Sequence, residues 1–520
     1  MQPVIQLTNP SLWRRAVWPL SLLLLAGLLL QNAWVVDDAY ISFRTAENLV
    51  QGRGLTWNPG ERVQAFTHPL WLLVVAAARS LSGEFFFTVI ALSLGLTLAS
   101  LWLAANLPGV RRWWLGPLLA LGLAASKAPL DYASSGLETP LTYLFVVVFL
   151  RQLLAGPRLL PLTLLAGLAW CNRQDTLLLF LPGLAWALWQ NRLLGWRVLL
   201  RQLALASAPA WLWATFALWY FGSILPNTVY AKLACTGLPP AWRLQRGLEY
   251  LLQSLQTDLA AWLLLALAAV LAWRQRSVVR GLALAGAGLY VLSVVASGAS
   301  ATHMAGRFFA VPLLVGLLTA LPALPNGRQA GLVAALLLAW LLHSPVSPLK
   351  FGTFAYDPGR QIESALDVKF EVLHEGAALL NYRPGLAMPA HAWLAAGQQL
   401  RQSGQTLQVG GLHGKEAVGY FAFAAGPAVT LVDLCGLTDP LLARLPAALP
   451  QHIDDWKSGH FHRPLPAGYL DSLQNGRPNL ANPQLQRAFE RVWLATRAPL
   501  LAPGRLQAIL ELQLQGCLGP

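Results

Sequence analysis

Two adjacent carboxylates, Asp37 and Asp38, stand where a long apolar stretch ends, in the segment DDAYISFR at residues 37–44. A carboxylate held beside a reacting hydroxyl group can accept its proton as a general base, which typically accelerates a reaction by about 10²–10⁴-fold. Neighbouring carboxylates repel each other, and this raises the pKa of one of them unless a cation or metal ion intervenes. The pair is therefore the first candidate for chemistry, although adjacent acids can also mark the water boundary of a membrane helix.

The segment after this pair is rich in turn-forming and aromatic residues. GRGLTWNPGERVQAFTHPLW at residues 52–71 carries Asn58, Glu61, Arg62 and His68 among glycines, prolines and rings. A plain helix boundary does not require so long a stretch of turn chemistry. We therefore expect the loop at 36–68 to have a function of its own, above the helix end.

Basic residues stand near the ends of other apolar stretches. Arg173, Lys232 and Arg307 do so, and His303 precedes Arg307 in the segment THMAGRFF. Arginine binds a phosphate through two parallel hydrogen bonds, and lysine acts as a point charge. These residues therefore predict a phosphate site; the alternative for each is a local ion pair or a side chain that reaches out to the membrane surface.

Composition indicates the elements that must position these residues. The chain has 520 residues, 56% of them hydrophobic and only 12% charged, and its mean hydropathy is +0.49. Soluble domains carry roughly 25% charged residues. The net charge of +14 is concentrated in short loops between apolar runs, as the positive-inside rule describes. The charge therefore does not indicate a nucleic-acid partner, and membrane lipids are the expected surroundings.

The apolar runs predict a polytopic α-helical membrane protein, because a bilayer core needs about 20 apolar residues per helix. The stretch at 69–82 is short and contains Arg79, so we expect an interfacial or re-entrant helix on the outer side. The expected transmembrane helices number about eleven and cover residues 16–35, 84–106, 114–130, 139–153, 159–170, 176–190, 200–221, 258–273, 281–297, 308–324 and 329–343.

Charge also predicts the orientation. If the N-terminus is inside, every inner loop is basic, as Arg111 with Arg112 and Arg274 with Arg276 illustrate. Nearly all acids of residues 1–343 then fall in outer loops. We expect the N-terminus inside, a retained first helix, and both Asp37 and the C-terminal part outside, as in a multi-pass protein of a bacterial inner membrane.

Residues 344–520 are richer in proline, glycine, histidine and charge, and they lack an apolar run of membrane length. Strands are expected at 406–411 and 428–434, with helices at 415–424 and 441–448. We therefore predict two domains, a membrane domain at 1–343 and a compact extracytoplasmic α/β domain at 344–520. Cys435 and Cys517 could pair outside the cytoplasm, although isolated cysteines are the simpler interpretation.

Several segments resemble bacterial glycosyltransferases of the GT-C superfamily, in particular polyprenyl-phosphate-arabinose-dependent arabinofuranosyltransferases. These include the mycobacterial terminal arabinofuranosyltransferases and the enzymes that decorate pilins. The opening motif and the segment at 431–446 are specific, and the resemblance covers most of the chain. The matching segments are DDAYISFRTAENLVQGRGLTWNPGERVQAFTHPLW, SSGLETPL, CNRQDTLL, LPNTVYAK, HMAGRFFAVP, LVDLCGLTDPLLARLP and GHFHRPLPAGYL.

The resemblance implies transfer of a sugar, most notably D-arabinofuranose, from a polyprenyl monophosphate to a cell-envelope glycan or surface protein. It makes Asp37 the base candidate, with Asp38 orienting it and His303 as a further catalytic candidate. The donor phosphate would contact Lys232, Arg307 and Arg173. The residues expected to bind sugar or acceptor are Tyr40, Arg44, Asn58, Glu61, His68, Glu138, Asn227 and Tyr230.

No cofactor is required by this chemistry, and a divalent metal at the aspartate pair stays open. Members of the family often have GGD shortly before His303, where this chain reads GASATHM, so no role is carried over for that acid. Mannose, glucose or aminoarabinose are alternative donor sugars. A transporter or flippase of lipid-linked sugars is the rival class, but its expected charges near the bilayer midplane and repeat symmetry are not found.

Overall fold

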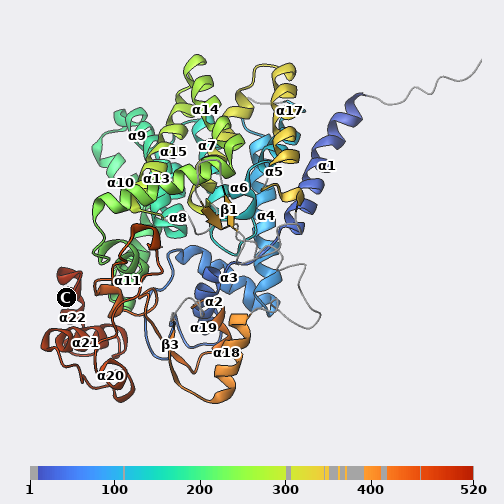
Figure 1. Ribbon diagram of the computed structural model, residues 1–520. Coiled ribbons are helices and arrows are strands. Elements are labelled where there is room, and N and C mark those ends of the chain that lie inside the picture. Colours follow the sequence, from blue (N-terminus) through green and yellow to red (C-terminus); the bar gives the residue numbers. More distant parts are fainter. Residues whose placement is uncertain are drawn as a thin grey trace, which may run out of the picture.

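The computed structural model describes residues 10–108, 112–299, 306–344, 346–350, 361–363, 369–371, 392–410, 418–456 and 458–518. Most of this part of the chain is helical. In Figure 1 the apolar helices occupy the upper part of the molecule, and α18 to α22 gather at the lower end with α2. The aspartate pair and the loop that follows it thus lie where these two parts meet.

Each of the eleven apolar stretches contains a helix. The first half of the chain forms α1 (Pro10–Gln31), α2 (Asp37–Val50), α3 (Pro69–Ser82), α4 (Phe86–Ala105), α5 (Leu115–Ala124), α6 (Lys127–Asp131), α7 (Thr139–Ala155), α8 (Leu159–Asn172), α9 (Leu177–Gln190), α10 (Trp196–Ala206) and α11 (Ala208–Phe221). It continues through α12 (Asn227–Val229), a π-helical turn (Tyr230–Ala234), α13 (Pro240–Thr257), α14 (Leu259–Arg274), α15 (Val278–Ser297), α16 (Ala310–Ala320) and α17 (Gly327–His343).

Short 3-10 turns join several of these helices. They are η1 (Gln174–Thr176), η2 (Arg192–Leu194), η4 (Arg307–Phe309), η5 (Leu321–Ala323) and η6 (Pro348–Lys350). Gly83 ends the predicted interfacial helix α3 in the left-handed region, with φ at +87°, a conformation that glycine adopts without steric cost.

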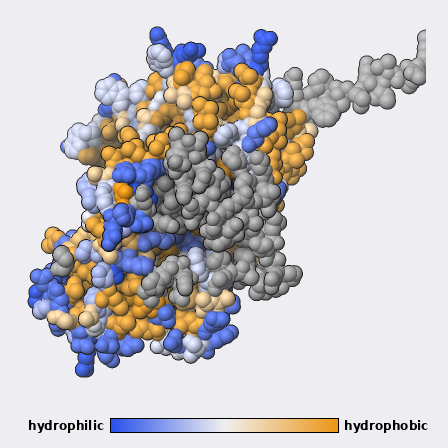
Figure 2. Space-filling model, viewed as in Figure 1, coloured by the Kyte–Doolittle hydropathy of each residue, from blue (hydrophilic) through white to orange (hydrophobic). Residues whose placement is uncertain are grey.

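Two helices of the described chain, α4 and α15, are long and apolar enough to cross a membrane. The number rises to four if the bent pairs α10–α11 and α13–α14, with angles of 55° and 98°, each form one span. Seven further apolar helices are shorter, α5 and α7 among them. Hydrophobic side chains cover much of the upper helical region on the face drawn in Figure 2, so candidate membrane helices are present, whereas eleven spans stay a prediction.

The helices pack closely where small residues face a neighbouring backbone. A Cβ atom built on Gly286 of α15 would lie 2.1 Å from the carbonyl oxygen of Leu179 in α9. A Cβ atom on Gly247 of α13 would lie 1.9 Å from the carbonyl oxygen of Val295. Such small-residue contacts are typical of helices that pack in membranes, and here they bring α13 and α9 against α15, next to the cavity described below.

The C-terminal part contains two small sheets and several helices. Strands β1 (Gln361–Glu363) and β2 (Lys369–Glu371) pair antiparallel, and β3 (Leu407–Gly410) and β4 (Thr430–Asp433) pair parallel, with Val409 opposite Val432. The remaining elements are α18 (Ala392–Ser403), α19 (Tyr420–Ala425), η9 (Leu442–Arg444), η10 (Ile453–Asp455), α20 (Tyr469–Asn475), α21 (Pro483–Thr496) and α22 (Arg505–Gln515).

Both expected strands of this part are present, and the expected helices are shorter than predicted. The helix expected at 415–424 is observed as α19, beginning at Tyr420, and its first residues lie outside the described chain. The helix expected at 441–448 is only the 3-10 turn η9. Asp439 caps this turn, since its carboxylate accepts hydrogen bonds from the backbone N–H groups of Leu441 and Leu442.

A disulfide joins Cys235 to Cys517 across 282 residues of sequence. Cys435, which the sequence suggested as a partner of Cys517, is a free and buried thiol, as is Cys171. The expected alternatives were therefore both wrong: Cys517 does pair, but with a cysteine of the loop that follows Lys232. Pairing was not predictable because it depends on the approach of two segments far apart in sequence.

Candidate active site

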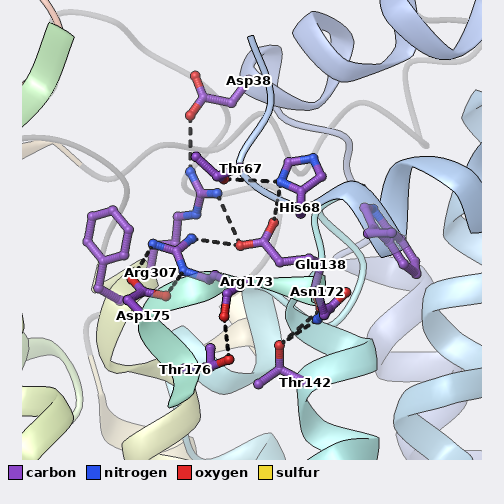
Figure 3. A network of polar contacts seen from close by, with 12 residues as sticks. Asp38, Thr67, His68, Glu138, Thr142, Asn172, Arg173, Asp175, Thr176 and Arg307 are labelled. Carbon is purple, nitrogen blue, oxygen red and sulfur yellow. Dashed lines mark hydrogen bonds and ion pairs between the residues drawn. The ribbon is translucent and has the colours of Figure 1, made fainter. Parts of the chain in front are cut away.

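A cavity of about 350 Å³ lies between the segment at 36–68, the ends of apolar helices and the C-terminal part. Five of the predicted site residues line it, and their side chains come from five separate segments of the chain. They are Asp38, His68, Arg173, Lys232 and Arg307. Figure 3 shows how His68, Arg173 and Arg307 converge on the carboxylate of Glu138, while Asp38 contacts Arg307.

Asp38 is the carboxylate of the opening pair that faces the cavity. It lies in the first turn of α2, where the positive end of the helix dipole favours a negative charge. Its Oδ2 atom accepts a hydrogen bond of 3.0 Å from Nη1 of Arg307, and the Asp38 side chain is 25% exposed. A cavity ligand can therefore reach both partners of this ion pair.

Glu138 lies behind the cavity wall, with a side-chain exposure of 1%. Its Oε1 atom lies 2.7 Å from Nη1 of Arg173 and 3.6 Å from Nη2 of Arg307, and its Oε2 atom lies 3.2 Å from Nδ1 of His68. Burial by itself would raise the pKa of Glu138, but His68 and the two arginines hold that pKa below its usual range. The ionised carboxylate thus fixes both guanidinium groups in place.

Arg173 makes a second, bidentate pair with Asp175, at 2.7 and 2.9 Å. Its guanidinium carbon lies 4.9 Å from the ring centre of Phe308, and that of Arg307 lies 5.5 Å from the same ring. Glu138 and the Phe308 ring therefore hold two arginines side by side, an arrangement suited to a phosphate with several oxygens.

Lys232 adds a third cation to the cavity wall. Burial lowers the pKa of its ammonium group, Asp38 opposes this, and the positive charges of Arg307 and Arg173 lower that pKa further. Within the described part of the chain Lys232 forms no ion pair. A negatively charged ligand between these three cations would relieve their mutual repulsion.

Apolar side chains also line the cavity. Leu178 of α9, Val294 of α15 and Leu233 line it together with Phe308. Helix α15 is a candidate membrane span, and α9, whose sequence is almost entirely apolar, packs against it. The cavity therefore brings a charged pole next to an apolar one, as an amphiphilic ligand requires.

Asp37 occupies a different place from its neighbour. Its carboxylate accepts hydrogen bonds from the backbone N–H groups of Tyr420, at 2.6 Å, and Gly419, at 3.3 Å, so it joins α2 to the first turn of α19. It does not line the cavity. Burial raises the pKa of Asp37 to about 7, although the two backbone hydrogen bonds oppose this and Asp38 adds to it. The expected base is thus engaged in docking two parts of the chain.

Six other predicted sugar or acceptor residues lie outside the cavity and connect the outer loops with the C-terminal part. The Tyr40 ring packs on Tyr420, and Arg44 donates to the carbonyl oxygens of Trp57, Ala422 and Val429. Asn58 bonds both the backbone N–H and the carbonyl of Leu431 in β4, and Glu61 pairs with Arg497 at 3.2 Å. Asn227 donates to the carbonyls of Gly436, Leu437 and Asp439, and Tyr230 packs under Arg444.

These contacts differ from the sugar-binding roles that the sequence suggested. Tyr40 packs through its ring, and the other five side chains hydrogen-bond with the fold itself, on segments about 200 residues or more away in several cases. A polar residue in a long loop gives the same sequence signal whether it binds a ligand or a distant backbone. His303 lies outside the described residues.

Ser42 and Thr67 are among the cavity residues that sequence reasoning missed. Ser42 follows Asp38 by four residues on α2, so the helical spacing that puts both side chains on one face was the available signal. Among the described residues there is no group of three or more His, Cys, Asp or Glu side chains that could hold a metal ion. Asp37 and Asp38 point to different partners, so this pair does not form a joint ligand set.

Fold and cavity together define a mainly helical protein with candidate membrane spans, in which acidic and basic side chains meet apolar helix ends. The chain is similar to the terminal beta-(1->2)-arabinofuranosyltransferase of Mycobacterium tuberculosis, with 28% identity over 226 residues, which is 39% of this chain and 35% of the relative. It is also similar to the protein of the same name from Corynebacterium glutamicum, with 29% identity over 234 residues, which is 39% of this chain and 33% of the relative.

These similarities confirm the resemblance to arabinofuranosyltransferases that the motifs predicted, over the part of the chain that matches. The chain matches about a third of the length of each relative. No protein-family profile matches it, and no solved structure does.

Proposed function

We propose that this protein is a membrane glycosyltransferase that moves a sugar, D-arabinofuranose, from a polyprenyl monophosphate to a hydroxyl group of an envelope glycan or surface protein. The observation that carries the proposal is the cavity itself. Asp38, Arg307, Arg173 and Lys232 line it, together with apolar side chains of α9 and α15. The similarity to two arabinofuranosyltransferases supports the sugar.

The three cations would hold the donor phosphate and stabilise its charge as it departs. The bond between the sugar and the phosphate oxygen breaks, so negative charge grows on that oxygen during the reaction. Preorganised positive groups at such a position lower the barrier without having to reorient. The polyprenyl chain would leave along the apolar side chains. No nucleotide-binding motif is needed, because the leaving group is a simple phosphate.

Asp38 is the base candidate that the geometry favours, in place of Asp37. Its carboxylate faces the cavity and one oxygen contacts Arg307, whereas both oxygens of Asp37 are taken by backbone N–H groups. Phosphate binding at Arg307 would draw the guanidinium away from Asp38 and leave the carboxylate ready to accept the acceptor's proton. Asp37 would then hold α19 against α2 and so close the site.

The proposed setting is the outer face of a bacterial inner membrane, with the N-terminus inside. The basic inner loops support this orientation, and so does the disulfide between Cys235 and Cys517, since disulfides persist in oxidising compartments. The wall that carries Lys232 and the C-terminal helix α22 would therefore both lie outside the cytoplasm. The two proposed domains would meet at the cavity.

The experiment supplies the purified protein in nanodiscs with synthetic polyprenyl-phosphate sugars and a fluorescent oligosaccharide acceptor. We expect transfer from the arabinofuranose donor, seen by mass spectrometry as an added pentose of 132 Da, roughly the mass of one anhydropentose unit. Donors carrying mannose, glucose or aminoarabinose serve as competitors. Transfer from one of these alone would replace the sugar assignment, and no transfer from any lipid-linked donor would contradict the proposed function.

A further inference from the structure

Ser42 and His68 form a hydrogen-bonded pair at the cavity, backed by Glu138. The hydroxyl oxygen of Ser42 lies 2.8 Å from Nε2 of His68, and Nδ1 of the same ring lies 3.2 Å from Oε2 of Glu138. Ser42 and His68 line the cavity, while Glu138 is buried behind them. Neither the phosphate site nor the proposed base uses the Ser42 hydroxyl.

The carboxylate of Glu138 determines which nitrogen of His68 carries the proton. A lone pair on Nδ1 would face the Glu138 Oε2 atom at 3.2 Å, which is repulsive, whereas an Nδ1–H group is attracted by that charge, although Oε2 makes no hydrogen bond. The hydroxyl oxygen of Thr67, which lies 3.4 Å from Nδ1, can accept the hydrogen of such an Nδ1–H group. Burial lowers the pKa of His68 to about 4, and although Glu138 opposes this, Arg307 and Arg173 lower that pKa further. The ring is therefore neutral at neutral pH, with its only proton on Nδ1 and a lone pair on Nε2.

The state of His68 in turn fixes the Ser42 hydroxyl. Because Nε2 can only accept, Ser42 donates its single hydrogen to His68, and its oxygen has only lone pairs left for the cavity. Such an oxygen attracts an O–H group of a ligand and repels a phosphate oxygen. The two carboxylate oxygens of Glu138 thus support two different subsites. Oε1 positions the cations for a phosphate, and Oε2 positions, through His68, a hydrogen-bond acceptor for a hydroxyl group.

We propose that Ser42, oriented by His68 and Glu138, is the subsite that accepts a hydrogen bond from one hydroxyl group of the donor sugar. This inference rests on the proposed lipid-phosphate sugar donor. Both subsites are held by one carboxylate group, so they are as close together as the phosphate and the hydroxyl groups of a single sugar phosphate. Glu138 and His68 are positioning residues, and Ser42 is the one that touches the sugar.

A Ser–His–acid series also occurs in enzymes whose serine is a nucleophile, but the surroundings of Ser42 do not suit that role. Ser42 lies inside α2, where backbone N–H groups are used by the helix and cannot stabilise an oxyanion beside the serine. A histidine with a pKa of about 4 is also a weak base for removing the serine proton at neutral pH.

Donor analogues that each lack one hydroxyl, as deoxy and deoxyfluoro sugars, test the subsite through their binding to the protein in nanodiscs, measured without acceptor. For the wild type we expect one position at which both analogues bind about 10-fold more weakly than the parent donor, the effect of one hydrogen bond. Fluorine can accept a hydrogen bond but cannot donate one. If the deoxyfluoro analogue binds as weakly as the deoxy analogue, the hydroxyl group of the parent donor at that position donates its hydrogen bond. Ser42→Ala should bind the parent donor more weakly than the wild type does. Its affinity for the parent donor should be no higher than its affinity for the analogues modified at that one position.

Further variants separate this role from a general effect on folding. Ser42→Thr keeps a hydroxyl and should restore discrimination at that position, and Glu138→Gln should weaken it while the Ser42 hydroxyl is intact. Ser403→Ala is the matched control, because that hydroxyl lies in α18, outside the cavity lining, and bonds only nearby backbone: it donates to the carbonyl of Leu400 and accepts from the N–H of Gln405. If Ser42→Ala still discriminates between the parent donor and its analogues as the wild type does, or loses this discrimination equally at all positions, the result contradicts the subsite alone. A wild type that does not bind the parent donor contradicts the proposed function instead.

Discussion

Arg307 donates a hydrogen bond of 3.0 Å to Asp38, although 269 residues separate them in sequence. The pair joins the proposed base to a proposed phosphate ligand. Each charge keeps the other compensated while the cavity holds no ligand, and a bound phosphate would compete with Asp38 for the guanidinium group. Donor binding and activation of the base would therefore be coupled through one ion pair.

Replacing Lys232 by alanine tests the phosphate site without breaking an ion pair of the described chain. A charge-assisted contact is worth about 1.5–3 kcal/mol, so Lys232→Ala should raise the donor KM by about 10-fold to 100-fold. Lys232→Arg should retain part of the affinity. Steady-state kinetics over a range of donor concentrations measures both, with Arg491→Ala, a surface variant on α21, as the control. Wild-type KM in Lys232→Ala would remove this residue from the phosphate site.

The disulfide between Cys235 and Cys517 is open to a direct chemical test. Alkylation of the denatured, unreduced protein should label two thiols, Cys171 and Cys435, and labelling after reduction should reach four. A cross-link of this kind typically contributes about 2–4 kcal/mol to the free energy of unfolding, so Cys235→Ser with Cys517→Ser should lower the Tm. Four labelled thiols before reduction would contradict the bond and weaken the outer placement of both segments.

Reporter fusions test the orientation. A reporter active only in the periplasm should be active when fused after Pro520 and inactive when fused at Arg328, which lies in the first turn of α17. Basic residues in inner loops set this orientation. Reversed signals would place Asp38 on the cytoplasmic side, where it could not meet a donor on the outer face.

Asp37 gives the prediction for pH. Its pKa of about 7 in the folded protein lies above the ordinary value of 3.8, so the folded state binds this proton more tightly than the unfolded state. The contribution of Asp37 to stability is then fully present below about pH 4 and is lost as the pH rises through 7. Thermal unfolding should show that the Tm of the wild type, relative to Asp37→Asn, falls between pH 5 and pH 8. A constant difference would mean that the pKa is not raised.

The helices and the cations at the cavity were predictable from sequence, and the different partners of the two aspartates were not. Apolar stretches such as 84–106 locate α4 because helix length follows from hydropathy. Arg173, Lys232 and Arg307 could be chosen because basic residues at the predicted outer ends of helices depart from the positive-inside rule. Asn58 and Asn227 looked equally suitable for sugars, but their partners are backbone groups of the C-terminal part.

The same limit explains Asp37 and Ser42. Neighbours in a helix point about 100° apart, so Asp37 and Asp38 face different surroundings, and only the position of α19 shows which carboxylate is occupied. Ser42 carries no signal by itself; its role depends on His68, which arrives from the end of the loop. Long-range packing, absent from local sequence patterns, decides both.

The most direct test of the account compares Asp38→Asn with Asp37→Asn in the transfer reaction, using purified variants in nanodiscs and saturating lipid-linked donor. Asparagine keeps the size of the side chain but cannot accept the acceptor's proton, so Asp38→Asn should lose about 10²–10⁴-fold in kcat. Asp37→Asn should keep most of the wild-type kcat, because Asp37 does not line the cavity and the amide oxygen of asparagine can still accept from the N–H of Tyr420, although the longer bond from Gly419 is lost. Glu511→Gln, on the surface of α22 in an ion pair with Arg491, controls for loss of a carboxylate. Near wild-type turnover by Asp38→Asn, or a larger loss in Asp37→Asn, would contradict the assignment of Asp38 as the base.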